Sequence, residues 1–232
     1  MSASNSIAKS AVANSRKMLG AMVAIGLLCA LLISLTYEGT RPIIETKQAE
    51  ALQRAIFRVL PGTATTRAYR LTSGGRFVAA EGEAGSGELV YAGFDDKGEL
   101  TGVAIEASGQ GYAGIIRILY GYDPAKEAVV GMYVLESKET PGLGDKIEKD
   151  PDFLANFEAL DVSLTADGSA LKNEVVPVKD GEKEHPWQVD GITGATISSR
   201  AIGNMLGKST ARWVPLIHEQ RAVFEPKNEE RK

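Results

Sequence analysis

The sequence predicts an α+β protein in which a single N-terminal transmembrane helix is followed by a mostly antiparallel β domain with flanking helices. Three observations support this. An uncharged stretch of 20 residues lies near the N-terminus. Short segments of strand character, separated by turn residues, follow it, and helical patterns flank them. The strict alternation of strands and helices that is typical of a parallel doubly wound sheet is absent.

Composition narrows the class of protein further. The 232 residues carry a formal net charge of −4 and show no basic stripe, which argues against nucleic acid as a partner. Because Cys29 is the only cysteine, one chain cannot build a disulfide framework, a zinc site or an iron–sulfur cluster. Neither of the two histidines stands with a serine or a cysteine in a nucleophile–base arrangement, and no cluster of acids and histidines suggests a metal centre. We therefore assign no catalytic residue and no metal ligand.

Residues 18–37 form the uncharged stretch, which is predicted to be an uncleaved transmembrane helix. A helix of this length spans about 30 Å, the thickness of a bilayer core. Three basic residues and no acidic residue precede it. The positive-inside rule therefore places residues 1–17 in the cytoplasm and the C-terminal domain in the periplasm, as a single-pass protein of an inner membrane. A cleaved signal peptide, the alternative, has a shorter apolar core and a small-x-small cleavage site.

The region after the membrane is expected to begin with a linking helix, residues 38–62. Pro42 suits its first helical position, and the Pro-Gly pair at its end would stop it. Residues 63–218 then form the periplasmic domain, and residues 219–232 form a polar tail. The predicted strands of the domain include residues 76–80, 88–94, 100–107, 115–122 and 129–135.

Two of these hairpins resemble each other. Residues 93–108 and residues 121–137 both contain a glycine, an aromatic residue, an aspartate, a polar turn and an apolar strand with one glycine. An internal duplication would explain this likeness, but turn-forming residues would also recur in any two hairpins. Both explanations predict two antiparallel hairpins.

Two further helices and a strand are predicted near the C-terminus. Residues 150–160 form a short helix with Asp150 as its cap, residues 187–193 form a strand, and residues 197–213 form a longer helix. One side of the longer helix is expected to carry its apolar residues, Ile197, Ala201, Ile202, Met205 and Leu206.

Residues 109–114 read GQGYAG and match the dinucleotide-binding pattern G-x-G-x-x-G. That pattern needs a helix behind it, whereas the residues that follow are β-branched and aromatic and soon meet Pro124. We therefore expect a turn into a strand that lines a pocket, and no dinucleotide site.

Residues 190–203, DGITGATISSRAIG, run from a strand through a tight turn into a helix. The free amides and the positive dipole at a helix start favour an anion such as phosphate. Gly194 and Ala195 leave this surface open, and Thr193 and Thr196 place hydroxyls around it. The spacing leaves a second interpretation open, in which Thr196 or a nearby serine only caps the helix.

These residues also resemble the flavinylation motif of the FMN-binding domain family. The family includes the G subunit of the Rnf electron-transport complex and the C subunit of the sodium-pumping NADH:quinone reductase. The last threonine of the family's (S/T)-G-A-T core carries FMN through a phosphoester, and Thr196 occupies that position here. The resemblance implies that Thr193, Gly194 and Ala195 line the phosphate end, and that Asp190 belongs to what a flavin transferase recognises.

A second segment supports this resemblance. Residues 137–147 resemble the E-T-P-G-L-G loop that lies against the flavin in the same family, and GYAGII, which begins at Gly111, resembles the element before that loop. The loop residues implied to shape the ring site are Glu139, Thr140, Pro141, Gly142, Leu143 and Gly144.

The resemblance implies a membrane-anchored electron carrier with covalent FMN, which acts with other membrane subunits of an Rnf-type complex and is not a complete enzyme alone. Such a complex couples electron transfer between ferredoxin and NAD to ion translocation. The size of the chain and its I-T-G-A-T-I-S-S motif favour the G subunit of the Rnf complex over the C subunit of the quinone reductase. A flavin-free assembly or binding module on the membrane surface is the alternative from another class.

Overall fold

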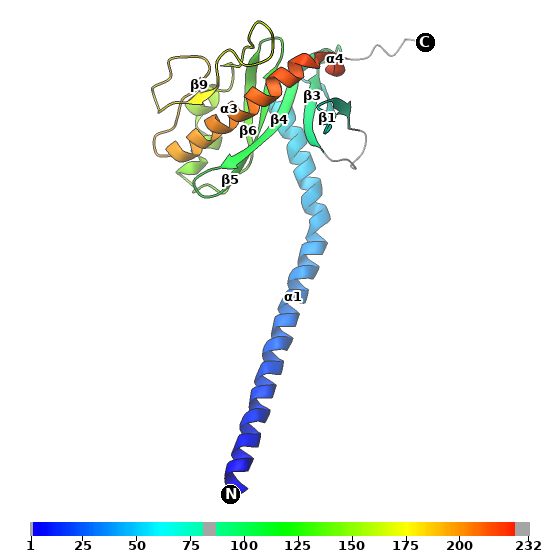
Figure 1. Cartoon of the computed structure of the whole chain (residues 1–232), viewed down its shortest axis with the longest axis vertical. Helices are drawn as coiled ribbons and strands as arrows, with labels where there is room; N and C mark the ends of the chain where they lie inside the picture. The colour runs from blue at the N-terminus through cyan, green and yellow to red at the C-terminus, as the bar shows by residue number, and fades with distance from the viewer. Residues whose placement is uncertain (1, 81–86, 226–232) are drawn as a thin grey trace, which may run out of the picture. The chain divides into compact units, whose positions relative to one another are not determined.

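The computed structural model describes residues 2–80 and 87–225, with side chains from residue 17 onward. An N-terminal helix, an antiparallel sheet and further helices confirm the predicted α+β class (Figure 1). The chain divides into two compact units, Met1–Glu50 and Ala51–Lys232. The second unit contains the sheet.

Helix α1 runs without interruption over Ser2–Val59. Within it, Lys17–Val59 is long and apolar enough to cross a membrane, judged by length and composition. Pro42 lies inside this helix, so its predicted place at the first helical position is wrong. The ion pair between Arg41 Nε and Glu45 Oε1, 2.8 Å, spans the proline on the helix surface. The helix thus continues past a residue that lacks an amide hydrogen, with an i,i+4 ion pair across it.

Among the described residues, the sheet has seven antiparallel strands in the order β2-β1-β3-β4-β5-β6-β7. The five strands predicted between residues 76 and 135 are all present, and β1 is an additional strand that was not predicted. The strand predicted over residues 187–193 is present only at Gln188–Val189, as β9, which forms a separate parallel pair with β8. The strands are β1 Thr65–Leu71, β2 Phe77–Ala79, β3 Glu88–Phe94, β4 Leu100–Gln110, β5 Ile115–Asp123, β6 Ala128–Glu136, β7 Leu160–Asp161, β8 Val176–Pro177 and β9 Gln188–Val189.

On one face of the sheet, the end of α1 packs against four strand glycines. A Cβ atom at Gly121 would collide with the carbonyl oxygen of Val59, and one at Gly131 would lie 2.8 Å from Val59 Cα. Val59 and Leu60 are fully buried there, so the helix backbone itself packs against the strands. We call this set of residues the glycine socket: Gly93, Gly102, Gly121 and Gly131.

The two hairpins that resemble each other, β3–β4 and β5–β6, use their shared residues in the same way. Asp95 Oδ1 accepts hydrogen bonds from two amides of its turn, both at 2.8 Å. Asp123 Oδ1 does the same at 2.9 and 3.3 Å. The preceding aromatic residues, Phe94 and Tyr122, are buried in the main core. Socket glycines face each other across each hairpin.

Helix α3, Thr196–Glu219, covers the other face of the sheet (Figure 1). Ile202 and Leu206 are fully buried, as the sequence predicted. The helix ends six residues later than expected because its apolar side continues through Val214 and Ile217. Two short helices, η1 Gly144–Glu148 and α2 Pro151–Ala155, lie beyond β6.

Two boundaries differ from the sequence prediction. Asp150 caps α2 as expected, through hydrogen bonds of 3.1 Å from two amides, but α2 ends at Ala155 because the chain then turns into β7. At the C-terminus, α4, Arg221–Phe224, places Phe224 in the core, with its ring centroid 4.9 Å from that of Tyr69. The packed domain therefore extends beyond residue 218. Residues 226–232 of the predicted tail lie outside the described part.

Candidate functional site

Thr196 is the first residue of α3, and its hydroxyl does not cap the helix. The N-cap residue is Ala195, and no side chain caps it. The Thr196 hydroxyl donates a long bond of 3.4 Å to the carbonyl of Ile192, and the Ser198 hydroxyl donates to Glu139. The capping interpretation is therefore wrong. Gly194 makes the turn before the helix with φ +87°, a left-handed conformation that favours glycine.

The start of α3 opens onto a cleft of about 310 Å³. This cleft brings together seven of the site residues proposed from the sequence, from two segments that are 50 positions apart at their nearest ends. Pro141, Gly142, Thr193 and Asp190 do not line it. Its lining residues are Tyr112, Glu139, Thr140, Leu143, Gly144, Gly194, Ala195, Thr196, Ile197 and Ser198.

Large apolar side chains surround the mouth of this cleft. Tyr112 is 69% exposed, Ile197 56% and Leu143 53%. Ile197 was expected with the apolar residues that face the core, and that expectation is wrong, because Ser198 and Ser199 take the buried positions of the first turn of α3 and Ile197 lines the cleft. Tyr112 belongs to the GQGYAG segment. There the amide of Gly111 donates to the carbonyl of Gly114 at 2.8 Å, which confirms a tight turn that lines a pocket.

Glu139 holds the walls of the cleft together. It is only 6% exposed. One carboxylate oxygen accepts the amide of Ala113 at 2.9 Å, and the other accepts the Ser198 hydroxyl. A Cβ atom at Gly111 or Gly144 would come within 2.5 Å of these oxygens, so both glycines make room for the carboxylate. Since the protein engages both oxygens, Glu139 is a positioning residue that joins three segments.

Glu139→Gln is expected to destabilise the protein by about 1–3 kcal/mol, because the amide nitrogen of glutamine would meet a donor where the carboxylate accepts a hydrogen bond. Thermal unfolding of the full chain in detergent measures this. Glu136→Gln is the matched control, since the Glu136 carboxylate is exposed and lies 3.5 Å from Arg117. Equal melting temperatures for the two variants would contradict the positioning role.

Asp190 and Thr193 lie at a neighbouring hollow of about 180 Å³ that they share with Asp180. The Thr193 amide donates to Asp180 at 3.2 Å, and the Gly181 amide donates to Asp190 Oδ2 at 3.1 Å. Asp190 Oδ1 is buried and has no hydrogen-bond partner in the described part of the chain. Burial lowers the pKa of the nearby Lys183 ammonium, and the Asp190 charge opposes that shift. These bonds fix the loop between β8 and β9 beside the turn that leads into α3.

Comparison with known proteins assigns this fold and cleft to a class. Residues 111–210, which contain the whole cleft, match the FMN-binding domain family. The fold resembles the crystal structure of Shewanella oneidensis NqrC, with a TM-score of 0.61 and 19% identity over 76% of this chain and 99% of that chain. It also resembles the C subunit of the Na⁺-translocating NADH-quinone reductase from Parabacteroides distasonis, with a TM-score of 0.57 and 24% identity over 74% and 94% of the two chains.

Curated relatives define the family more narrowly. The G subunit of the ion-translocating oxidoreductase complex of Methanosarcina acetivorans is 32% identical over 190 residues, which cover 82% of this chain and 89% of that protein. The protein of the same name from Escherichia coli K12 is 34% identical over 167 residues, or 70% and 74% of the two chains. This chain belongs to the family of G subunits of ion-translocating oxidoreductase complexes.

Proposed function

We propose that this chain is a flavoprotein subunit that transfers electrons within an ion-translocating oxidoreductase complex of the Rnf type, with FMN attached covalently to Thr196. Membership of the family supports the flavin and the complex. The attachment rests on one observation. Thr196 is an exposed residue at an uncapped helix start, and it lines a cleft with an apolar mouth.

The residues of the cleft can contact both the phosphate and the ring system of FMN. The amides of Thr196, Ile197 and Ser198 find no hydrogen-bond acceptor among the residues described, and a phosphate at the helix start supplies acceptors for them. The apolar side chains of Tyr112 and Leu143 can pack against a flat aromatic ring system. FMN supplies the redox chemistry that the side chains of this protein lack.

The attachment step needs an activated donor. The bond that forms joins Thr196 Oγ1 to phosphorus, and the hydroxyl proton leaves. Condensation with free FMN would release water and is unfavourable in aqueous solution. We therefore propose a flavin dinucleotide as donor, which releases a nucleoside monophosphate, and a separate flavin transferase as catalyst. Asp190, on the same connection to α3, is proposed to be part of what that enzyme recognises.

Location and partners follow from α1 and from the family. We propose a single-pass inner-membrane protein with residues 1–17 in the cytoplasm and the domain in the periplasm, because the three basic residues precede the apolar stretch. The other membrane subunits of the complex are the proposed partners. A covalent bond would keep FMN from being lost outside the cytoplasm.

Intact-mass measurement of the full chain, produced with and without a flavin transferase, tests the proposal. We expect the mass to rise by one FMN less one water only when the transferase is present, and the tryptic peptide that contains Thr196 to carry the increment. Unmodified peptide from a native host that makes the active complex would contradict it.

The C subunit of the quinone reductase is the second candidate, because the solved structures above are proteins of that kind. Their identities of 19% and 24% support the fold alone, whereas the curated G subunits reach 32–34%. Proteins that co-purify with the chain decide between the two candidates. Iron–sulfur partners of the ferredoxin-oxidising type would favour the Rnf-type complex.

A further inference from the structure

We propose that a groove between β4 and α3 binds an extended segment of a partner polypeptide, which adds to the sheet as a strand beside β4. The groove has a volume of about 600 Å³ and lies apart from the flavin cleft. We call it the strand groove. Its lining residues are Glu88, Glu106, Ala107, Ser108, Gly109, Gln110, Ala201, Asn204, Met205, Lys208, Ser209, Arg212 and Trp213. This inference goes beyond the proposed function, since it does not depend on flavin attachment.

The strand groove follows a free edge of β4. Pairing of β3 with β4 stops at Val90 and Ile105, whereas pairing of β4 with β5 continues to Gln110. The first two residues of β3 still pair with β1 and no longer with β4, so β3 and β4 diverge there. Residues 106–110 thus have β5 on one side and, within residues 2–80 and 87–225, no strand on the other. Alternate residues of such an edge point an amide and a carbonyl outward.

This edge lacks the features that usually protect an exposed strand. Residues 107–109 read Ala-Ser-Gly, without a charge or a proline. The one charged residue of this edge, Glu106, forms an ion pair with Arg117 of β5 at 2.8 Å. An edge of five residues is about 17 Å long, enough for a short strand.

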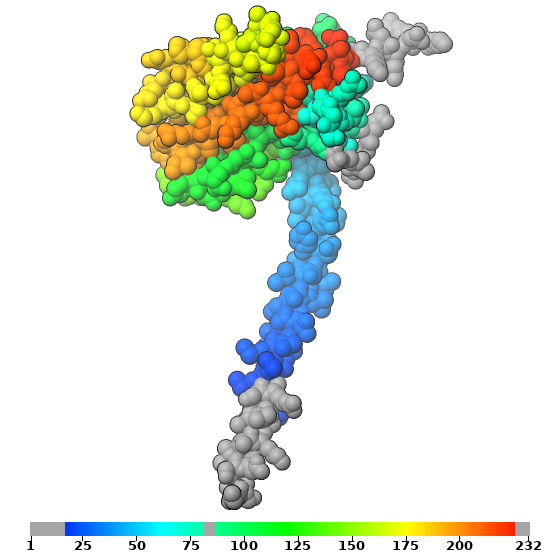
Figure 2. All heavy atoms as spheres, viewed as in Figure 1, coloured from blue at the N-terminus to red at the C-terminus, as the bar shows by residue number. Residues whose placement is uncertain are grey.

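Helix α3 forms the other wall of the groove. Figure 2 shows the surface of α3, in orange, directly beside the green surface of β4 and β5. The helix approaches β4 closely at Gly109, where a Cβ atom would lie 2.9 Å from Met205 Cγ. Arg212 donates a hydrogen bond of 2.9 Å to Glu88, and both residues line the groove. A strand edge on one side and a helix on the other is the arrangement in which proteins bind peptides by strand addition.

The strand groove lies next to the flavin cleft along the chain at both walls. Gln110 lines the groove, and Tyr112, two residues later, lines the cleft. On α3, Ala201 lines the groove one turn after Ile197, which lines the cleft. A partner segment bound in the groove would therefore place its subunit beside the mouth of the redox site.

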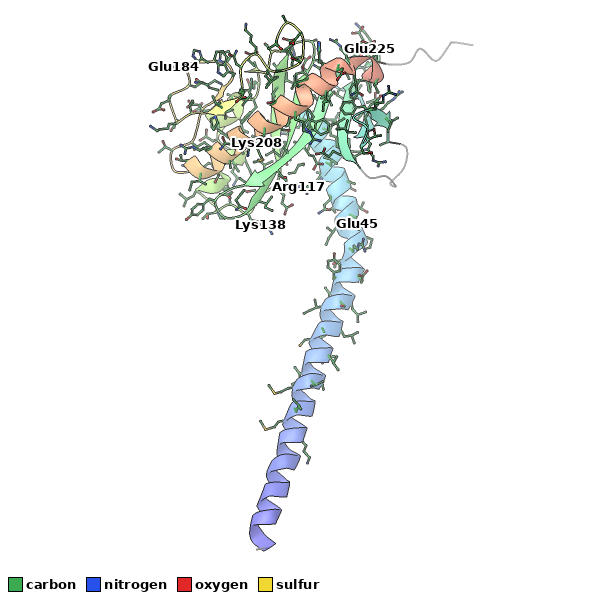
Figure 3. All side chains as sticks on the ribbon, in the orientation of Figure 1. Glu45, Arg117, Lys138, Glu184, Lys208 and Glu225 are labelled. Carbon is green, nitrogen blue, oxygen red and sulfur yellow. The ribbon has the colours of Figure 1, made fainter. Side chains whose placement is uncertain are left out.

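The chemistry of the groove defines its occupant. A row of outward amides and carbonyls is matched by the backbone of another extended chain. Lys208, which is labelled in Figure 3, lines the groove. It makes no ion pair with any residue that the structure describes. This cation favours a segment that carries an acidic residue. Asn204 also lines the groove and is exposed. A substitution or a crosslinker at this position can therefore test whether a segment binds there.

Backbone hydrogen exchange tests strand addition, because docking through side chains alone would leave the edge amides unpaired. We compare the assembled complex with the isolated full chain in the same detergent. Outward-facing amides within residues 106–110 should exchange at least about tenfold more slowly in the complex. Unchanged exchange at these residues would overturn the proposal.

Asn204→Trp should fill the groove. We expect it to lower recovery of the partner subunits by about tenfold while leaving FMN attachment, measured by intact mass, unchanged. Glu219→Trp, at an exposed position at the end of the same helix, is the matched control and should leave recovery unchanged. Equal recovery with both variants would contradict the proposal. Exchange protection in a native active complex whose Thr196 peptide is unmodified would leave this inference standing and contradict only the proposed function.

A photo-crosslinker at position 204 identifies the occupant. In the native complex we expect it to label one short contiguous segment of a partner subunit, with an acidic residue in that segment. Lys208→Glu should weaken this labelling. Labelling of a second copy of this chain, of the same chain, or of lipid alone would overturn the proposal.

Discussion

Thr196→Ala is expected to abolish covalently bound flavin. The substitution removes the hydroxyl oxygen that the phosphoester requires, while the helix start is held by Gly194 and by the bond from the Ser199 amide to the carbonyl of Ala195. The domain should therefore fold and assemble without in-gel flavin fluorescence and without the FMN increment in intact mass. Electron transfer by the complex should be lost with the flavin.

Two matched variants separate this loss from a structural effect. Thr196→Ser keeps a hydroxyl at the same position and should retain flavin. Thr193→Ala removes an exposed threonine that lines the neighbouring hollow instead of the cleft, and it should also retain flavin. Fluorescence and complex activity that both persist in Thr196→Ala would show that the covalent carrier is misassigned.

Gly121→Ala is expected to destabilise the protein by about 3 kcal/mol, the largest stability effect that we anticipate for adding one methyl group. The new Cβ would collide with the carbonyl oxygen of Val59, which is backbone and cannot rotate away. The end of α1 would have to lift from the sheet and expose Val59 and Leu60. The corresponding fall in melting temperature is about 6–12 °C for a chain of this size.

Gly74→Ala is the control for this experiment. A Cβ atom at Gly74 would meet only the Thr72 hydroxyl, at 3.9 Å. Its expected effect stays within about 0.5 kcal/mol, as for most exposed positions. Similar melting temperatures for Gly121→Ala and the unmodified chain would show that the helix end does not depend on the glycine socket.

Local patterns predicted the strands well, because turn residues and apolar runs mark them directly in the sequence. The additional strand β1 was missed since its sequence, TTRAYRL, carries two arginines and alternates weakly. Helix ends were less predictable, because packing decides them. Pro42 did not begin a helix, and α3 continued to Glu219 because its apolar side still contacts the core.

The sequence suggested most of the cleft because the relevant residues lie in two short motifs. It could not show how those motifs meet. Glu139 accepts a hydrogen bond from a residue 26 positions before it and another from a residue 59 positions after it, and no spacing rule predicts such pairs. The separation of Asp190 and Thr193 from the cleft likewise depends on the direction in which the turn before α3 leaves the strand.

The glycine socket changes how the likeness between the two hairpins is understood. Each hairpin crosses the same helix end, and each needs a residue without a side chain at the two places where the strands pass beneath it. Because the same steric requirement for glycine applies to both hairpins, their sequences resemble each other at these positions. Common ancestry of the hairpins is therefore not required to account for their resemblance.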